Sequence, residues 1–334
     1  MRRALVTGAT GLVGSYIVER LHADGWSVRA LVRDPARASW LQPLGAELFV
    51  GDVLDASAFV RAAASCEAIF HCAAAILPER AEWESYRRTN LDGTQNAIAA
   101  ARASGARLLH VSSVAVYGGA TRYRDTPTDE AVELPSLPET AFYARSKRES
   151  EAMVLDAHRR GEIWACAVRP DVIYGKRDRQ FVPRVGKILS RGLFPVLGGG
   201  RSTLPIVHAG NVADGAVRAI DADAAGGKAY NLANDYDVTV RDFVRLAAQG
   251  LRRRVILVPV PMVLAKAVFK VVTILIGTAR RGAALSQAGG TVAFLSRDNP
   301  FSSDRAKREL GWAPPVRPEA GIPEAFRWWT DHRA

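Results

Sequence analysis

Cysteine is scarce in this sequence: Cys66, Cys72 and Cys166 are the only three among 334 residues. All three lie in apolar stretches and show no metal-ligand spacing, so we expect neither a disulfide nor a zinc site. Buried thiols of this kind are typical of a reducing compartment, which predicts a cytoplasmic protein. No metal is expected.

Other features are also absent. The chain has no low-complexity tract and no obvious internal repeat, and Met1–Arg3 runs directly into an apolar stretch without a small-residue cleavage site. A secretory or twin-arginine export signal is therefore not expected. Hydrophobic residues make up 48% of the chain, enough to bury a large core in one domain or in two interleaved ones.

Acidic residues are outnumbered by basic ones, 34 to 45, which gives a net charge of +11. The basic residues are scattered, and the short clusters Arg252–Arg254 and Arg280–Arg281 are not interleaved with aromatic residues. We therefore attribute the charge to solubility and to attraction of an anionic cofactor. Nucleic-acid binding is the alternative, and we expect no such partner.

The most informative segment is glycine-rich and runs from Thr7 to Gly14, after the apolar stretch Ala4–Val6 and before the helical pattern Ser15–Leu21. Strand, glycine turn and helix in that order form a phosphate cradle. One glycine permits the tight turn, the next lets the backbone approach a pyrophosphate, and the third lets the helix pack on the strand. A glycine turn that serves packing alone is the alternative. The segment predicts a dinucleotide site with six contact residues: Gly8, Thr10, Gly11, Leu12, Val13 and Gly14.

Short apolar strands alternate with helices in the first half of the chain. Expected strands are 4–6, 27–32, 46–50, 68–71, 107–112 and 164–168, and expected helices are 15–24, 56–64, 94–104 and 143–160. This alternation predicts an α/β fold, a doubly wound parallel sheet of the Rossmann type.

The character changes near Gly175. We expect strands at 206–207 and 229–232 to return to the first sheet around a helix at 212–220, and a helix at 182–193. The predicted domains are a nucleotide-binding domain at 1–175, a first substrate-domain segment at 176–204, a return to the first domain at 205–233 and a mostly helical substrate domain at 234–334.

Tyr143 and Lys147 are four residues apart on an expected helix, which places the phenol and the ammonium on one face. A nearby cation favours a phenolate, so the pair suits proton exchange beside a carbonyl or alcohol. Ser112 and Ser113 end an apolar strand, at the edge where such sheets bind ligands. For the serines a turn or cap is the alternative, and Asn90 is equally explained as a helix cap.

Together these segments resemble an extended short-chain dehydrogenase/reductase over nearly the whole chain. The pattern is similar to the 3β-hydroxysteroid dehydrogenase and dihydroflavonol reductase branch of the NAD-dependent epimerase/dehydratase superfamily. The matching segments are Thr7–Gly14, Gly51–Val53, His71–Ala74, Asn90 with Gly93–Thr94, Ser112–Ser113, Tyr143 with Lys147, Arg169–Gly175 and Arg308–Trp312.

The resemblance implies a role for each matched residue. Tyr143 would be the catalytic acid/base, Ser113 would orient the reacting oxygen, and Lys147 would bind the nicotinamide ribose and lower the tyrosine pKa. Asn90 would act on the proton-relay side. Cofactor contacts are implied for Asp52, Val53, Ala73, Ala74, Pro170 and Val172.

The second expected strand ends at Val32 and is followed by Arg33. NAD-preferring relatives carry an acidic residue at the strand end, whereas an arginine is able to bind a 2′-phosphate in a bidentate manner. Arg37 would assist. NADP is therefore favoured over NAD, the alternative being that Arg33 is a solvated strand end and Asp34 binds the ribose.

The substrate is less defined. Sugar-nucleotide members of the superfamily usually carry an arginine and an acid where this chain has Leu204 and Pro205, before His208. A pocket without that arginine is a poor diphosphate site, which favours a secondary alcohol or ketone on a lipophilic steroid-, terpenoid- or flavonoid-like skeleton. Ser112, Tyr174, Leu204 and His208 are the candidate substrate contacts. Four other arginines keep a sugar-nucleotide epimerase or dehydratase open as the alternative: Arg177, Arg179, Arg184 and Arg201.

The strongest apolar stretch is 255–277. Two prolines and two lysines argue against a membrane-spanning helix. It is expected to form a substrate-domain helix, with a helix lying in the membrane interface as the alternative. A homodimer is expected from the resemblance, and a cofactor-sensing regulator is a second rival to the enzyme, although such a sensor does not need Ser113, Tyr143 and Lys147.

Overall fold

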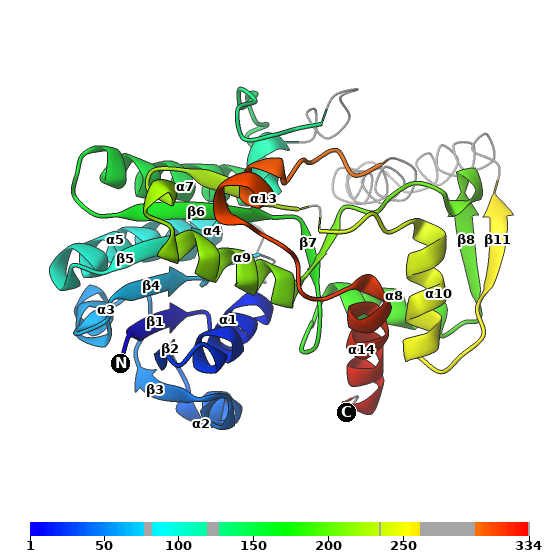
Figure 1. Cartoon of the computed structure of the whole chain (residues 1–334), viewed down its shortest axis with the longest axis horizontal. Coiled ribbons are helices and arrows are strands. Elements are labelled where there is room, and N and C mark those ends of the chain that lie inside the picture. Colours follow the sequence, from blue (N-terminus) through cyan, green and yellow to red (C-terminus); the bar gives the residue numbers. More distant parts are fainter. Residues whose placement is uncertain (77–81, 119–126, 234, 261–297, 333–334) are drawn as a thin grey trace. The chain divides into compact units, whose positions relative to one another are not determined.

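The computed structural model describes residues 1–76, 82–118, 127–233, 235–260 and 298–332. The central element is a seven-stranded sheet in the order β10-β6-β5-β4-β1-β2-β3, in which every neighbouring pair is parallel (Figure 1). Its strands are β1 (Arg3–Thr7), β2 (Ser27–Val32), β3 (Ala46–Val50), β4 (Ala68–His71), β5 (Arg107–Val111), β6 (Ala165–Pro170) and β10 (Ala229–Leu232). The predicted doubly wound α/β fold is confirmed.

Two apolar clusters cover the two faces of this sheet. Along β1, Ala4 and Val6 belong to one cluster and Leu5 to the other, because successive side chains of a strand point to opposite faces. The first cluster includes α1 (Leu12–Ala23) and α9 (Ala209–Asp221), and the second includes α3 (Ala56–Ala63), α5 (Gly93–Ser104) and α7 (Phe142–Arg159). Strands buried on both faces explain the continuous apolar runs in the sequence.

Shorter elements connect the strands of the sheet. A one-turn helix α2 (Pro35–Ala38) follows β2, and α4 (Trp83–Tyr86) leads through a π-helical turn at Arg87–Asp92 into α5. Further short segments are 3₁₀ helices at Ser39–Leu44, Val114–Tyr117, Gly198–Gly200 and Asp223–Ala225, and the helix α13 (Asp304–Leu310).

The chain divides into two compact units. Unit 1 comprises 1–173, 207–235 and 301–316, and unit 2 comprises 174–206, 236–300 and 317–334. Unit 2 contains α8 (Phe181–Leu189), β8 (Leu193–Leu197), α10 (Val240–Gly250), β11 (Ile256–Val260) and α14 (Pro318–Asp331), with β8 and β11 paired in parallel. Its core includes Phe243, whose ring lies 5.7 Å from that of Phe181 and 5.8 Å from that of Phe326.

Four details differ from the sequence predictions. β9 (Ile206–His208) pairs with β7 (Val172–Tyr174) in a separate two-stranded sheet, and only β10 joins the large one. The expected helix at 182–193 ends at Leu189, because Leu193 begins a strand. Phe301–Val316 packs with unit 1, where the Trp312 indole donates to the Asn211 carbonyl at 3.0 Å, although it was assigned to the substrate domain.

The apolar stretch 255–277 is the fourth difference. Its first part, Ile256–Val260, is a strand and not a helix, since a run with prolines at 259 and 261 lacks the backbone donors of a helix. The part from 261 lies outside the described residues. Within the described ranges no helix combines the length and apolarity needed to cross a membrane.

Candidate active site

The glycine turn follows directly after β1. Gly8 has a φ of +63°, and a Cβ there would lie 2.7 Å from the backbone nitrogen of Ala73, so only glycine fits between the ends of β1 and β4. A Cβ on Gly14 would lie 2.3 Å from the Gly8 carbonyl oxygen. Gly14 therefore lets the first turn of α1 pack on the glycine turn itself.

The N-terminus of α1 offers free backbone donors. Its N-cap residue, Gly11, makes no side-chain capping hydrogen bond, and the first turn contains no acidic residue. The helix dipole and these N–H groups favour an anion at this position. The turn and helix start thus fit the pyrophosphate of a dinucleotide, with the predicted Thr10, Leu12 and Val13 in the same segment.

Charged side chains follow the end of β2. Asp34 caps α2, because its carboxylate accepts hydrogen bonds from the backbone N–H of Ala36 at 3.0 Å and of Arg37 at 3.3 Å. Arg33 is exposed, and the Arg37 side chain is 89% exposed with its guanidinium 3.7 Å from the Asp34 carboxylate. The Asp34 carboxylate is therefore engaged in capping α2, while both arginines are accessible to an anion.

Tyr143 and Ser113 meet at the carboxyl end of β5. The Ser113 side chain lies close enough to Tyr143 to influence its pKa, and its hydroxyl accepts from the Ala115 backbone N–H at 3.1 Å, so it caps the 3₁₀ helix as well. Burial raises the pKa of Tyr143 above its ordinary value, and the interaction with Ser113 opposes this shift only in part. Tyr143 is consequently a neutral phenol at physiological pH.

Lys147 lies one helical turn after Tyr143 and is buried. Its Nζ donates to the Val111 carbonyl at 2.6 Å and lies 3.5 Å from Nε2 of His110. Burial lowers the pKa of Lys147 to about 8, with Glu151 acting in the opposite sense. The implied lowering of the tyrosine pKa by Lys147 is not seen, since the ammonium points to Val111 and the pKa of Tyr143 is raised.

Two buried histidines, His71 and His110, lie next to Lys147. The sequence analysis did not identify them as site residues. The rings of His71 and His110 stack with centroids 5.7 Å apart. Thr94 donates its only hydroxyl proton to the Asn90 carbonyl at 2.6 Å, so His71 Nε2 must donate to Thr94 and His71 Nδ1 must accept from Thr7. Burial lowers the pKa of His71 to about 3 and that of His110 well below 6.5, so both rings are neutral.

Asn90 is buried in the π-helical turn. Its side-chain oxygen accepts from the Ala75 backbone N–H at 2.7 Å, and its Nδ2 donates to the Ala75 carbonyl at 3.1 Å and to Ser146 Oγ at 2.9 Å. Ser146 in turn donates to the carbonyl of Tyr143 at 2.9 Å. Asn90 therefore joins the segment after β4 to the start of α7. It does not act as a helix cap.

The other predicted cofactor residues lie on neighbouring strand ends. Asp52 accepts from the Leu54 backbone N–H at 3.0 Å, and the Ala73 backbone N–H donates to Thr7 Oγ1 at 3.3 Å. The remaining predicted positions of this kind are Val53, Ala74, Pro170 and Val172, which follow β3, follow β4, end β6 and begin β7, respectively.

The four candidate substrate residues are divided between the units. Ser112 is buried beside Ser113, and His208 caps α9 by accepting from the Gly210 backbone N–H at 3.1 Å, with its ring against Tyr16. Tyr174 and Leu204 belong to unit 2, and both are buried. His208 thus has a structural function that its position in the sequence did not reveal.

A buried ion pair behind Lys147 was also missed. Arg169 binds Glu151 through two guanidinium nitrogens, at 2.9 and 2.5 Å, and donates to the Tyr117 hydroxyl at 2.7 Å. Tyr117 donates to Asn231 Oδ1 at 2.8 Å. Glu151 is four residues after Lys147 on α7, and this repeated i, i+4 spacing is the signal that could have shown it to share the same helix face.

Comparison with known proteins identifies the class of this fold and site. The model of the NAD dependent epimerase/dehydratase family matches residues 4–233. The chain belongs to this family and is an extended short-chain dehydrogenase/reductase, as the sequence resemblance predicted.

Individual members of the family and solved structures are similar to this chain over most of its length. The chain is 33% identical over 328 residues to a 4-hydroxy-2-methyl-3-oxo-4-farnesyl-3,4-dihydroquinoline-1-oxide ketoreductase from Stigmatella aurantiaca, covering 96% of this chain and 94% of that protein. It is 27% identical to the Arabidopsis thaliana 3beta-hydroxysteroid-dehydrogenase/decarboxylase isoform 3, covering 99% of this chain but 61% of that protein. The crystal structure of gox2253 matches with a TM-score of 0.76 at 28% identity, covering 99% of both chains.

Proposed function

We propose that this protein transfers a hydride between NADP and a secondary alcohol or ketone on a lipophilic skeleton, with Tyr143 as the acid/base. The observation that carries the proposal is the proximity of the Tyr143 and Ser113 side chains at the carboxyl end of β5, with Lys147 one turn further along α7. Two hydroxyl groups that converge at the ligand-binding edge of a doubly wound sheet suit the orientation of one substrate oxygen.

The residues divide the proton chemistry between them. The neutral Tyr143 phenol gives its proton to the substrate oxygen in the direction of reduction, and the Ser113 hydroxyl holds that oxygen. The nicotinamide, when bound, supplies or accepts the hydride. Lys147 holds its amine next to the end of β5, from where it would hydrogen-bond the nicotinamide ribose. Asn90 keeps the start of α7 in position through Ser146.

The cofactor preference is argued from the end of β2. Asp34 is engaged by two backbone N–H groups, whereas Arg33 and Arg37 are exposed. Guanidinium groups bind a phosphate with two parallel hydrogen bonds, which supports NADP over NAD. Replacing Arg33 by Ala is expected to raise the Michaelis constant for NADPH by about tenfold or more, with that for NADH nearly unchanged. An equal effect on both cofactors would contradict the assignment. Arg61→Ala, on α3, is the matched control.

The lipophilic substrate is supported by two independent facts. Leu204 is 2% exposed and occupies a position where sugar-nucleotide enzymes usually carry a charged residue. The Stigmatella relative is named for a ketone that bears a farnesyl chain, and the plant relative for a hydroxysteroid. Both names describe an oxygen on a large apolar skeleton.

The deciding experiment measures nicotinamide absorbance with NADPH or NADH and a panel of steroid, flavonoid and isoprenoid ketones. Consumption of NADPH by the wild type and its loss in Tyr143→Phe, with cofactor affinity retained, is the expected result. Retained turnover in that variant would remove Tyr143 from the mechanism. Interconversion of UDP-sugars without net consumption of cofactor would replace the proposal by the epimerase. Cofactor binding without any turnover would favour the sensor.

A further inference from the structure

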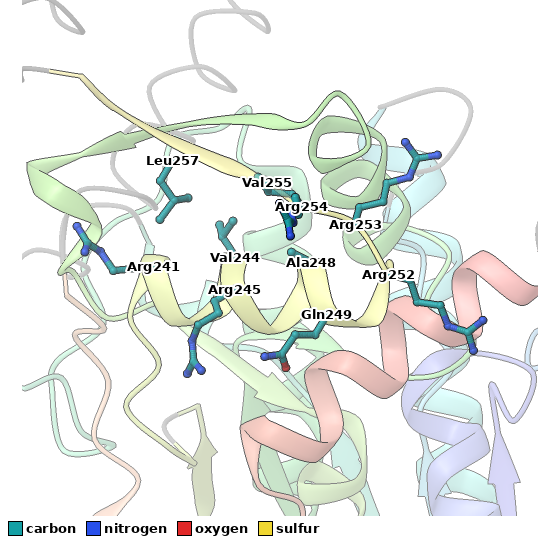
Figure 2. A pocket seen from close by; sticks show the side chains of 10 residues that line it. All are labelled: Arg241, Val244, Arg245, Ala248, Gln249, Arg252, Arg253, Arg254, Val255 and Leu257. Atoms are coloured by element: carbon teal, nitrogen blue, oxygen red, sulfur yellow. The ribbon is translucent and has the colours of Figure 1, made fainter.

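Unit 2 contains an arginine-lined hollow between α10 and β11. Its volume is about 620 Å³, within the range of small-molecule sites. Figure 2 shows Val244 and Ala248 of α10 facing Val255 and Leu257, which form the apolar lining. Its polar lining consists of Gln249 and five arginines: Arg241, Arg245, Arg252, Arg253 and Arg254.

The positive charge of this hollow is poorly compensated. Asp242 lies 3.4 Å from Arg245, both at exposed positions, and it is the one carboxylate paired with the five arginines in the described part of the chain. Arg241 donates to the Gly199 carbonyl at 3.1 Å and Arg253 to the Ser190 carbonyl at 3.5 Å, which leaves both charges unneutralised. In Figure 2 the side chains of Arg241, Arg245, Arg252 and Arg253 point outward from the hollow in different directions, so these residues surround it with positive potential, which favours an anion.

Arg252 has an unusual backbone conformation for an arginine. Arg252 directly follows the C-cap of α10 and has a φ of +53°, a conformation that favours glycine. The turn is closed by hydrogen bonds from the Arg252 N–H to Gln249 and from the Arg253 N–H to Ala248, both at 3.0 Å. An arginine here costs conformational energy that a glycine would not. Arginine is therefore not the residue that would stabilise this turn most.

We propose that this hollow binds a phosphate-bearing amphiphile. Guanidinium groups are the preferred partners of phosphate oxygens, and the lining of Val244, Ala248, Val255 and Leu257 provides a surface for a short apolar chain. In Figure 2 the Arg254 side chain extends toward α10 beside Ala248, so charge and apolar surface adjoin. A free alkyl phosphate and the head group of a membrane phospholipid share this chemistry. The site does not depend on the proposed reaction.

The test uses the full-length protein saturated with NADP and measures binding of hexyl phosphate by calorimetry, with inorganic phosphate and hexanol as ligand controls. Hexyl phosphate is expected to bind more tightly than either control. Arg254→Gln is expected to weaken it at least about fivefold, because a charge-assisted hydrogen bond is lost. Arg159→Gln removes an arginine side chain that is 75% exposed on α7 and is expected to have no effect.

The variant Arg252→Gly distinguishes a loss of ligand binding from a loss of folding stability. This variant is expected to raise the Tm, because it relieves the left-handed backbone, and to weaken hexyl phosphate binding. Lower affinity in a more stable protein cannot come from misfolding. Unchanged affinity in both Arg252→Gly and Arg254→Gln would overturn the proposal, as would an equal loss in Arg159→Gln.

A second experiment determines whether the bound phosphate belongs to a membrane lipid or to a soluble ligand. Cosedimentation is measured with phosphatidylcholine vesicles that contain or lack phosphatidylglycerol. Loss of cosedimentation in the same two variants would assign the site to a membrane lipid, whereas their effect on hexyl phosphate alone would assign it to a soluble ligand. Both results support a phosphate site. No binding of the wild type to either probe would refute it.

Discussion

The Lys147 ammonium donates a 2.6 Å hydrogen bond to the carbonyl of Val111, the last residue of β5. This bond fixes α7 to the strand that presents Ser113. The amine is buried in unit 1, 3.5 Å from Nε2 of the neutral His110, on which the neutral His71 ring stacks. Its charge therefore lies in a region where water contributes little to its solvation.

This burial predicts a pH dependence of stability. The folded pKa of Lys147 is about 8, below the ordinary 10.5. Between these values the unfolded chain binds the proton and the folded chain does not, so stability rises with pH across this window. Relative to Lys147→Met, the wild type should gain up to about 3 kcal/mol of unfolding free energy between pH 8 and 10.5.

The measurement is denaturant unfolding of both proteins at several pH values. Titration of the other groups is common to both and cancels in the difference. A difference that stays constant with pH would show that the Lys147 pKa is not depressed in the folded state.

The neutral state of Tyr143 predicts different pH profiles for the two reaction directions. Burial raises the pKa of Tyr143, so the phenol holds its proton at neutral pH and is ready to donate it. Ketone reduction should therefore be nearly level from about pH 6 to about 9, while alcohol oxidation should rise with pH because it needs the phenolate. Initial rates at saturating cofactor measure both profiles. An oxidation rate that is already level at pH 7 would contradict the raised pKa.

The sequence predicted the sheet closely because most of its strands are buried along nearly their whole length, as Ala68–His71 is. The predicted ends of Ser27–Val32, Ala46–Val50 and Ala68–His71 match the structure. The strand Ile256–Val260 was missed because the apolar run continues past residue 260, and the periodicity of a continuous apolar run cannot distinguish a strand from a helix.

The candidate site was predictable where chemistry requires particular residues at short spacing. Tyr143 and Lys147 are four apart, and Ser113 ends a strand, so their positions followed from local rules. Contacts such as Arg169 with Glu151 and the stacked pair of His71 and His110 join residues from separate strands and helices. Such contacts depend on tertiary packing, which one sequence does not reveal.

The Arg169–Glu151 pair should contribute strongly to stability only while both partners are present. Glu151→Leu leaves the Arg169 guanidinium buried without its carboxylate, and we expect a loss of about 3 to 5 kcal/mol of unfolding free energy. The double variant Glu151→Leu/Arg169→Met removes both charges and should recover a large part of that loss. Chemical denaturation of the four proteins in the cycle gives the coupling energy. Equal losses in the single and double variants would indicate that the cost comes from packing.

Gly14 gives a prediction that runs against helix propensity. Replacing a glycine inside a helix by alanine usually stabilises a protein by about 1 kcal/mol. At Gly14 the added Cβ would lie 2.3 Å from the Gly8 carbonyl oxygen and 2.9 Å from Cα of Ala9, both backbone atoms. The glycine turn must therefore shift, and both the Tm and the affinity for NADP should fall.

Gly105→Ala is the matched control for this substitution. Gly105 has a φ of +70° with open space around its Cβ position, so alanine there costs about 1 kcal/mol of backbone strain without displacing another group. Its Tm should fall modestly and its NADP affinity should be unchanged. If Gly14→Ala bound NADP as tightly as Gly105→Ala, the glycine turn would serve packing alone, and the dinucleotide would have to be held by other contacts.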